Sequence, residues 1–162
     1  MEFDLRVNGQ THTVDVEPDM PVLYVLMNDL ELQGPRFGCG MAQCGSCSVL
    51  VDGREIRSCV TPVSSIGDQE VTTLEGLPEW FARGQGVSPA RHPMQQAMID
   101  QQAVQCGYCS NGIIVKAAEL LAANSAPTDP EIRSAMNGHL CRCGTYPRIL
   151  EAIHQASRDM RG

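Results

Sequence analysis

The first 75 residues contain short runs in which hydrophobic and polar side chains alternate, as they do in β-strands. Residues 3–7 and 12–16 alternate in this way and are separated by Asn8-Gly9, a dipeptide typical of a tight β-hairpin. Residues 48–60 repeat the pattern around Asp52-Gly53, and residues 71–74 add a last short run. The sequence therefore predicts two hairpins and one further strand.

One helical period interrupts these strands. Pro21 is followed by Leu23, Leu26, Met27 and Leu30, whose spacing places them on one helix face. Proline is favoured in the first turn of a helix, so the helix is expected to begin at Pro21. The first half of the chain is thus predicted to be a mixed sheet with one helix packed across it.

From residue 92 onward the hydrophobic period is helical. The predicted helices are residues 92–105, a helix capped by Ser110 that ends before Asn124, a helix from the capping box Thr128–Glu131 to Gly138, and a helix that starts at Thr145-Tyr146-Pro147. They form two pairs with cysteines at the turn of each pair. This arrangement predicts a four-helix bundle in which both turns meet at one end.

The predicted fold class is therefore α+β, in two domains. The sheet domain is expected to span residues 1–76 and the helical domain residues 92–162. Residues 77–91 show no sustained period and contain four turn-forming residues, which predicts a connector packed on a surface. These four residues are Pro78, Gly84, Gly86 and Pro89.

Composition limits the possible partners. The 162 residues carry a net charge of −7, and the basic residues are scattered, which argues against a nucleic-acid partner. No apolar run approaches the about 20 residues needed to span a bilayer. The N-terminal residues lack the basic start and apolar core of a secretory signal. We expect a cytoplasmic chain that reaches a membrane or another compartment only through a partner.

The eight cysteines fall into two quartets. The first is Cys39, Cys44, Cys47 and Cys59, with the C-x4-C-x2-C…C spacing of plant-type [2Fe–2S] ferredoxins. Interleaved glycines allow the positive φ angles that a tight loop around an inorganic core requires. Disulfides are disfavoured in a cytosolic chain of this size, and a structural zinc site usually needs two C-x2-C pairs. This quartet therefore predicts a [2Fe–2S] cluster in a plant-ferredoxin-like β-grasp domain.

The second quartet is Cys106, Cys109, Cys141 and Cys143. A C-x2-C pair can be a redox dithiol, but that motif is expected in a βαβ context rather than between helices. A C-x-C pair is unusual for zinc. Both pairs lie at helix turns, where helix N-termini can offset the charge of thiolates. The spacing alone predicts a four-thiolate metal site and favours iron–sulfur.

Taken in order, the cysteine motifs resemble the iron–sulfur subunit of the xanthine oxidase family of molybdenum hydroxylases. The motifs that carry the resemblance are residues 37–40, 44–47, 57–59, 105–109 and 140–146. The resemblance covers roughly residues 2–156 and, within the family, is to the small subunits of nicotinate dehydrogenase and isoquinoline 1-oxidoreductase. One departure is Asn111, where many relatives have proline.

The resemblance implies an electron-transfer subunit with two [2Fe–2S] clusters that is not catalytic alone. A large partner subunit would hold the molybdopterin and hydroxylate an N-heteroaromatic or aldehyde substrate with oxygen from water. The helical-domain cluster would lie beside the pterin, and the ferredoxin-like cluster would pass electrons to a flavin subunit, to cytochrome c or to another acceptor. By resemblance Gln105 hydrogen-bonds the pterin and Cys143 lies against it; the alternative for Gln105 is a surface helix cap.

Two other functions remain open from the sequence. A free-standing two-cluster electron carrier would show a charged face around its exit cluster, whereas a permanent subunit would show an apolar or neutral face around Cys106–Cys143. A zinc scaffold would be colourless. His139 is expected to be a packing residue or to hydrogen-bond a metal ligand, and Arg142 and Arg148 to anchor a partner or offset cluster charge.

Overall fold

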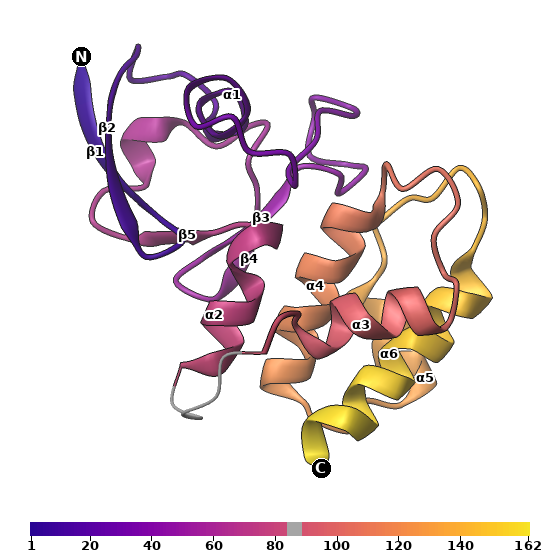
Figure 1. Ribbon diagram of the computed structural model, residues 1–162. Helices are drawn as coiled ribbons and strands as arrows, with labels where there is room; N and C mark the ends of the chain where they lie inside the picture. The colour runs from indigo at the N-terminus through magenta and orange to yellow at the C-terminus, as the bar shows by residue number, and fades with distance from the viewer. Residues whose placement is uncertain (84–88) are drawn as a thin grey trace.

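The computed structural model describes residues 1–83 and 89–162, and these form a sheet half and a helical half side by side (Figure 1). Within these residues the sheet has five strands in the order β2-β1-β5-β3-β4. The strands are β1 (Glu2–Val7), β2 (Gln10–Asp15), β3 (Ser48–Val51), β4 (Arg54–Arg57) and β5 (Glu70–Thr72). β1 and β5 are parallel and the other pairs are antiparallel.

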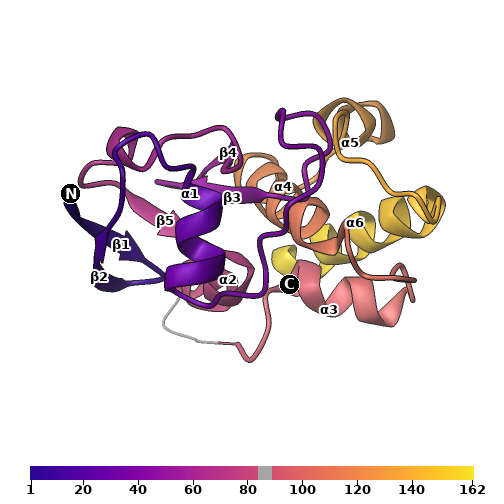
Figure 2. The ribbon, with the colours of Figure 1, turned by 90° about the horizontal axis from the view of Figure 1, so that it is seen from above.

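Both predicted hairpins are confirmed. Asn8 and Gly9 have φ angles of 51° and 79°, and Asp52 and Gly53 have 47° and 79°, so each turn has the left-handed pair that a two-residue hairpin requires. The helix expected at Pro21 forms as α1 (Val22–Tyr24), continues as a π-helical turn (Val25–Asp29) and crosses the sheet (Figure 2). The predicted mixed sheet with one crossing helix is therefore confirmed.

The helical half contains the four predicted helices, some with different ends. They are α3 (Pro93–Asp100), α4 (Ser110–Ala123), α5 (Asp129–Ala135) and α6 (Tyr146–Arg161). The Thr128–Glu131 capping box is confirmed. α5 ends at Ala135, three residues before the predicted stop at Gly138.

Two expectations about these helices are wrong. α3 ends five residues early because Gln102 adopts a left-handed conformation, with φ 49°. No turn-forming residue in the sequence predicts this conformation. Ser110 does not cap α4, because Cys109 occupies the N-cap position and no side chain there makes a capping hydrogen bond.

The expected irregular connector begins with a helix, α2 (Leu77–Ala82). Pro78 suggested a break, yet it lies in the first helical turn, where proline is favoured. Leu77 is fully buried in the core of the helical half, and Trp80 packs against the same core. Gly84 and Gly86 lie outside the described residues.

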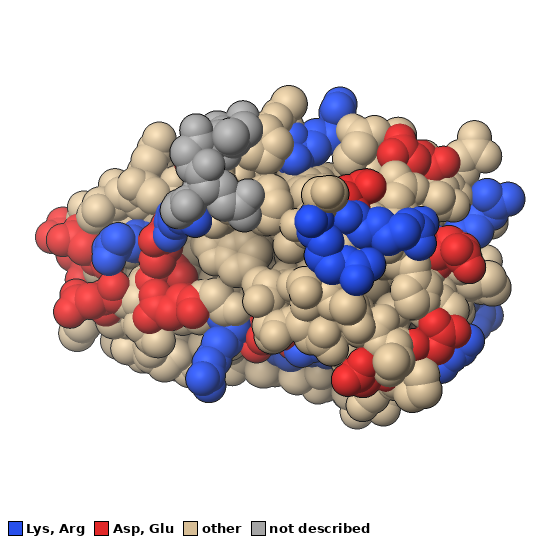
Figure 3. All heavy atoms as spheres, turned by 90° about the horizontal axis from the view of Figure 1, so that it is seen from below, with Lys and Arg blue, Asp and Glu red and all other residues tan. Residues whose placement is uncertain are grey.

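Each half has its own hydrophobic core, and β3 contributes to both. Val49 and Val51 face the core of the sheet half, whereas Leu50 belongs to the core of the helical half. Successive side chains of a strand point to opposite faces, so β3 packs against both hydrophobic cores. Among the described residues no helix is long and apolar enough to cross a membrane. On the face shown in Figure 3, Lys and Arg are interspersed with Asp and Glu.

Candidate metal centres

The first quartet lies in the loop before β3 and at the end of the β3–β4 hairpin. Backbone N–H groups of Met41, Gln43 and Cys44 lie 3.4, 3.2 and 3.3 Å from Cys39 Sγ, and the Cys39 N–H lies 3.4 Å from Cys44 Sγ. Burial opposes ionisation of the Cys39 thiol, but these N–H donors outweigh it and lower its pKa to about 7. The loop therefore already presents donors to a thiolate.

The loop needs residues that tolerate a left-handed backbone. Gly40, Ala42 and Gly45 have φ angles of 67°, 62° and 83°. A Cβ on Gly38 would lie 2.6 Å from Cys44 Sγ, so a side chain there would collide with the sulfur. The predicted role of the interleaved glycines agrees with this geometry.

Cys47 and Cys59 form the other pair of the first quartet. They are buried with Leu23 in a small apolar cluster beneath the loop. Burial raises the pKa of the Cys47 thiol to about 12, and the neighbouring Cys59 thiol adds to the effect. Two thiols held this close in an apolar site need a cation to stabilise their thiolate forms.

The second quartet is also assembled as two pairs, Cys106 with Cys143 and Cys109 with Cys141, in which each thiol shifts the pKa of its neighbour. Burial raises the pKa of Cys109 to about 12. Burial likewise opposes ionisation of Cys141, but the backbone N–H and hydroxyl of Thr145 lower its pKa to about 7.

The donor set in each quartet fits a [2Fe–2S] cluster. Such a cluster takes four cysteine thiolates shared between two iron atoms, which matches sulfurs arranged two by two. A structural zinc ion instead takes all its donors around one point.

The loops of the two quartets touch each other directly. The Leu140 N–H, one residue before Cys141, donates to the Cys44 carbonyl oxygen at 3.0 Å. The Tyr108 hydroxyl, from the Cys106–Cys109 turn, donates to the Phe37 carbonyl. In Figure 1 both cysteine turns of the helical half lie at the same end, beside the loop that precedes β3. The structure thus brings the two predicted metal sites together.

Asn111 and Gly112 fix this contact from the first turn of α4. Asn111 Nδ2 donates to the carbonyl oxygens of Ser46 at 2.8 Å and Ser48 at 3.0 Å. A Cβ on Gly112 would lie 1.9 Å from the Gly45 carbonyl oxygen. The departure at Asn111 therefore has a structural role: its amide ties α4 to the first cysteine loop.

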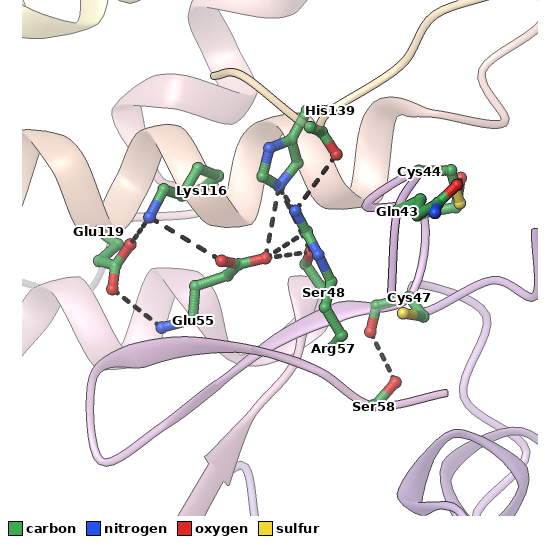
Figure 4. Close-up of polar contacts among 12 residues, drawn as sticks. Gln43, Cys44, Cys47, Ser48, Glu55, Arg57, Ser58, Lys116, Glu119 and His139 are labelled. Atoms are coloured by element: carbon green, nitrogen blue, oxygen red, sulfur yellow. Dashed lines mark hydrogen bonds and ion pairs between the residues drawn. The ribbon is translucent and has the colours of Figure 1, made fainter. Parts of the chain in front are cut away.

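A partly buried ion-pair network lies behind the two loops (Figure 4). The Arg57 guanidinium donates to the Glu55 carboxylate, to Ser48 Oγ at 2.5 Å, to His139 Nε2 at 2.8 Å and to the Gly138 carbonyl at 3.2 Å. Burial would raise the pKa of Glu55, but His139, Ser48 and Arg57 lower it to about 2. The network joins β3 and β4 to the segment that precedes Cys141.

The same network continues along α4. The Glu119 carboxylate accepts the Glu55 N–H at 2.9 Å, and Lys116 Nζ lies 2.5 Å from Glu119 and 3.8 Å from Glu55. His139 is buried, as expected for a packing residue, but it contacts this network. Sequence reasoning missed this network because the contacts that join β4 to α4 and to His139 link residues more than 60 positions apart.

The predicted pterin-side residues lie on the surface. Gln105 is exposed in the loop between α3 and α4 and caps neither helix. Cys143 is partly exposed, and Arg142 and Arg148 are exposed near it. The Arg148 guanidinium also donates to the Gln101 carbonyl at 3.1 Å.

Comparisons with known proteins agree with this architecture. A 2Fe-2S iron-sulfur cluster binding domain matches residues 5–73, and a [2Fe-2S] binding domain matches residues 73–154. One of the nicotinate dehydrogenase subunits of Pseudomonas putida is 47% identical, covering 98% of this chain and 96% of its own. The alpha chain of isoquinoline 1-oxidoreductase from Brevundimonas diminuta is 46% identical, covering 97% and 98%.

A solved structure supports the same grouping. A chain of quinoline 2-oxidoreductase from Pseudomonas putida 86 superposes with a TM-score of 0.88 at 32% identity, covering 99% of this chain and 96% of that one. The sheet half is ferredoxin-like, and the chain carries two [2Fe–2S]-binding domains. The protein belongs to the two-cluster iron–sulfur subunits of the xanthine oxidase family of molybdenum hydroxylases, as the cysteine motifs predicted.

Proposed function

We propose that this chain carries electrons from a molybdopterin centre on a large partner subunit to an external acceptor, during water-dependent hydroxylation of an N-heteroaromatic or aldehyde substrate. Bound [2Fe–2S] clusters supply one-electron carriers. The observation that carries the proposal is the direct contact between two assembled cysteine quartets, at Leu140 N–H and the Cys44 carbonyl. The proposed ligands are Cys39, Cys44, Cys47 and Cys59 for the first cluster, and Cys106, Cys109, Cys141 and Cys143 for the second.

The protein itself contributes three things to this function. N–H groups in the first loop stabilise thiolates at Cys39 and Cys44. The contact between the loops holds the two sites at a fixed separation. The apolar surroundings of Cys47 and Cys59 exclude water from one side of the first site.

The surface around the second quartet favours a permanent partner over a free carrier. Val104, Tyr108, Leu140 and Tyr146 are 42%, 47%, 58% and 45% exposed there. A transiently docking carrier is expected to surround its exit site with charge, whereas permanent interfaces are more apolar. We therefore propose that this face binds the molybdopterin subunit, with Gln105 and Cys143 against the pterin and Arg142 beside them.

The finer features of the fold are proposed on the same basis. The sheet half is a β-grasp domain of residues 1–76, residues 77–91 are a connector, and residues 92–162 are a four-helix bundle. The contacts of α3 with α4 and α6, and of α5 with α4 and α6, support a bundle. A flavin subunit or a cytochrome c is the proposed acceptor at the sheet half, and a cytoplasmic location remains a prediction.

The test is to isolate the chain under gentle conditions with whatever co-purifies and to measure iron, molybdenum and zinc. About four iron atoms per chain, as two [2Fe–2S] clusters require, with molybdenum on a larger co-purifying chain would support the proposal. The same iron without molybdenum or a partner would favour the free-standing carrier. Zinc in place of iron would exclude both redox functions.

A further inference from the structure

Thr145 lies at the N-cap position of α6 but does not cap it. Threonine at this position ordinarily accepts a hydrogen bond from an N–H in the first helical turn. Here the backbone has φ −77° and ψ 19°, and the side chain makes no capping hydrogen bond. Thr145 Oγ1 instead lies 3.6 Å from Cys141 Sγ, and the residue is only 7% exposed. The hydroxyl is therefore directed at a proposed cluster ligand rather than at its own helix.

The direction of this hydrogen bond follows from the chemistry of the sulfur. A metal-bound thiolate carries no proton, so the hydroxyl must donate and the sulfur must accept. The Cys141 N–H is already bound to the Tyr146 hydroxyl oxygen at 2.7 Å. The two residues that begin α6 thus hold Cys141 at two separate atoms, its nitrogen and its sulfur.

A second hydroxyl belongs to the same quartet. Ser110 follows Cys109, the cysteine paired with Cys141, and its Oγ is buried without a hydrogen-bond partner. Buried hydroxyl groups are nearly always hydrogen-bonded. Because Ser110 directly follows the proposed ligand Cys109, a sulfur of the bound cluster would be the acceptor for this hydroxyl.

We propose that the Thr145 hydroxyl donates to the Cys141 thiolate of the second cluster and, together with the Ser110 hydroxyl, makes that cluster easier to reduce. The inference rests on the proposed function and deepens it. Reduction adds negative charge to the cluster and its sulfurs, and a donated hydrogen bond stabilises the more negative state. Thr145 is a positioning residue that acts through Cys141.

The first quartet offers a matched control. Ser46 Oγ lies 3.6 Å from Cys44 Sγ, the same separation as in the Thr145 contact. A Ser46→Ala variant removes a hydroxyl near the other cluster. If side-chain hydroxyls act locally, Thr145 and Ser46 variants must each affect a different cluster.

The experiment is a redox titration of the intact complex, followed by the separate EPR signals of its two reduced clusters. Thr145→Val removes the hydroxyl with little change in volume, and Thr145→Ser keeps it. We expect Thr145→Val to lower the ratio of reduced to oxidised second cluster about tenfold at a fixed potential, which is about 59 mV for a one-electron couple. We expect Thr145→Ser to behave as the wild type, Ser110→Ala to shift the same cluster in the same direction, and Ser46→Ala to shift only the first.

An unchanged second-cluster potential in Thr145→Val, or an equal shift in both clusters, would overturn the inference while leaving the proposed function intact. An unchanged potential in Ser110→Ala would overturn the part assigned to Ser110. If Thr145→Val does not retain its iron, Thr145→Ala removes the hydroxyl without branched bulk and is judged by the same titration. A wild-type complex without iron would instead refute the proposed function itself.

Discussion

The partly buried ion pair between Arg57 and Glu55 is predicted to hold the two halves of the protein together. The two side chains are only 17% and 11% exposed, and Arg57 also donates to the Gly138 carbonyl on the segment before Cys141. Arg57→Met retains most of the side-chain length but removes the charge and its hydrogen bonds. The Glu55 carboxylate would then remain buried without its guanidinium.

The expected cost follows from the surroundings of Glu55. Removing one partner of a buried ion pair costs about 3–5 kcal/mol when the other charge is left unpaired. Lys116 Nζ, at 3.8 Å, and His139 Nε2, at 3.4 Å, would still lie beside the Glu55 carboxylate. We therefore expect the lower end of this range, about 3 kcal/mol. In a protein of this size that loss would lower Tm by about 6–12 °C.

The assay is thermal unfolding of the iron-loaded protein by circular dichroism at one scan rate. Arg54→Met is the matched control, since Arg54 is exposed on the same strand and should leave Tm nearly unchanged. The Arg57→Met/Glu55→Met double variant should show a smaller decrease in Tm than the sum of the decreases in the two single variants, because it leaves neither charge without its partner. A Tm for Arg57→Met within about 2 °C of the wild type would refute the reasoning, since even 1 kcal/mol shifts Tm by about that much.

The pH dependence of the same pair has a definite sign. The folded-state pKa of Glu55 lies below its ordinary value, so its contribution to stability is present above about pH 4.5 and is lost as the pH falls toward 2. Glu55→Gln should remove this part of the acid sensitivity. Equal slopes of Tm against pH for this variant and the wild type below pH 4.5 would contradict the assignment.

Three further predictions concern other buried contacts. Burial lowers the pKa of His92 from 6.5 to about 4. The free energy of unfolding of the wild type should therefore fall by about 3 kcal/mol as the pH falls from 6.5 to 4. His92→Gln should flatten the plot of Tm against pH over this interval. Gly112→Ala should abolish stable iron binding because its Cβ would collide with the Gly45 carbonyl, whereas Gly67→Ala, with φ 56° but no neighbour within 4 Å, should retain iron. Asn111→Ala should lower stability by about 1–3 kcal/mol by unfolding measurements, since two buried carbonyl groups lose their donor.

The elements that the sequence predicted well are set by interactions between near neighbours. Asn8-Gly9 adopts the two left-handed conformations that a tight hairpin needs. Thr128 and Glu131 make the reciprocal capping hydrogen bonds at the start of α5. The cysteine spacings are equally local, because each loop must wrap around its own site. The turn and cap signals are complete within a few residues, and each short cysteine motif can be identified without knowledge of the rest of the fold.

The errors arose where tertiary contacts decide the outcome. α2 forms because Leu77 and Trp80 bury against the helical core, although Pro78 and nearby glycines suggested an irregular connector. Ser110 is a residue type that favours helix caps, but Cys109 occupies the N-cap position and Ser110 is the first residue of α4. Local preference favours a helix cap at both Ser110 and Thr145, but neither hydroxyl makes a capping hydrogen bond.

The contact between the two halves shows why the candidate site could be predicted only in part. Cysteine spacing identifies two metal sites but contains no information on how far apart they lie. That separation depends on the first turn of α4, where Gly112 permits its backbone to meet the Gly45 carbonyl and Asn111 binds the same loop. Both residues lie within three positions of Cys109, and Gly45 lies between Cys44 and Cys47. A side chain at position 112 would therefore force the two ligand sets apart and disrupt iron binding, even with all eight cysteines in place.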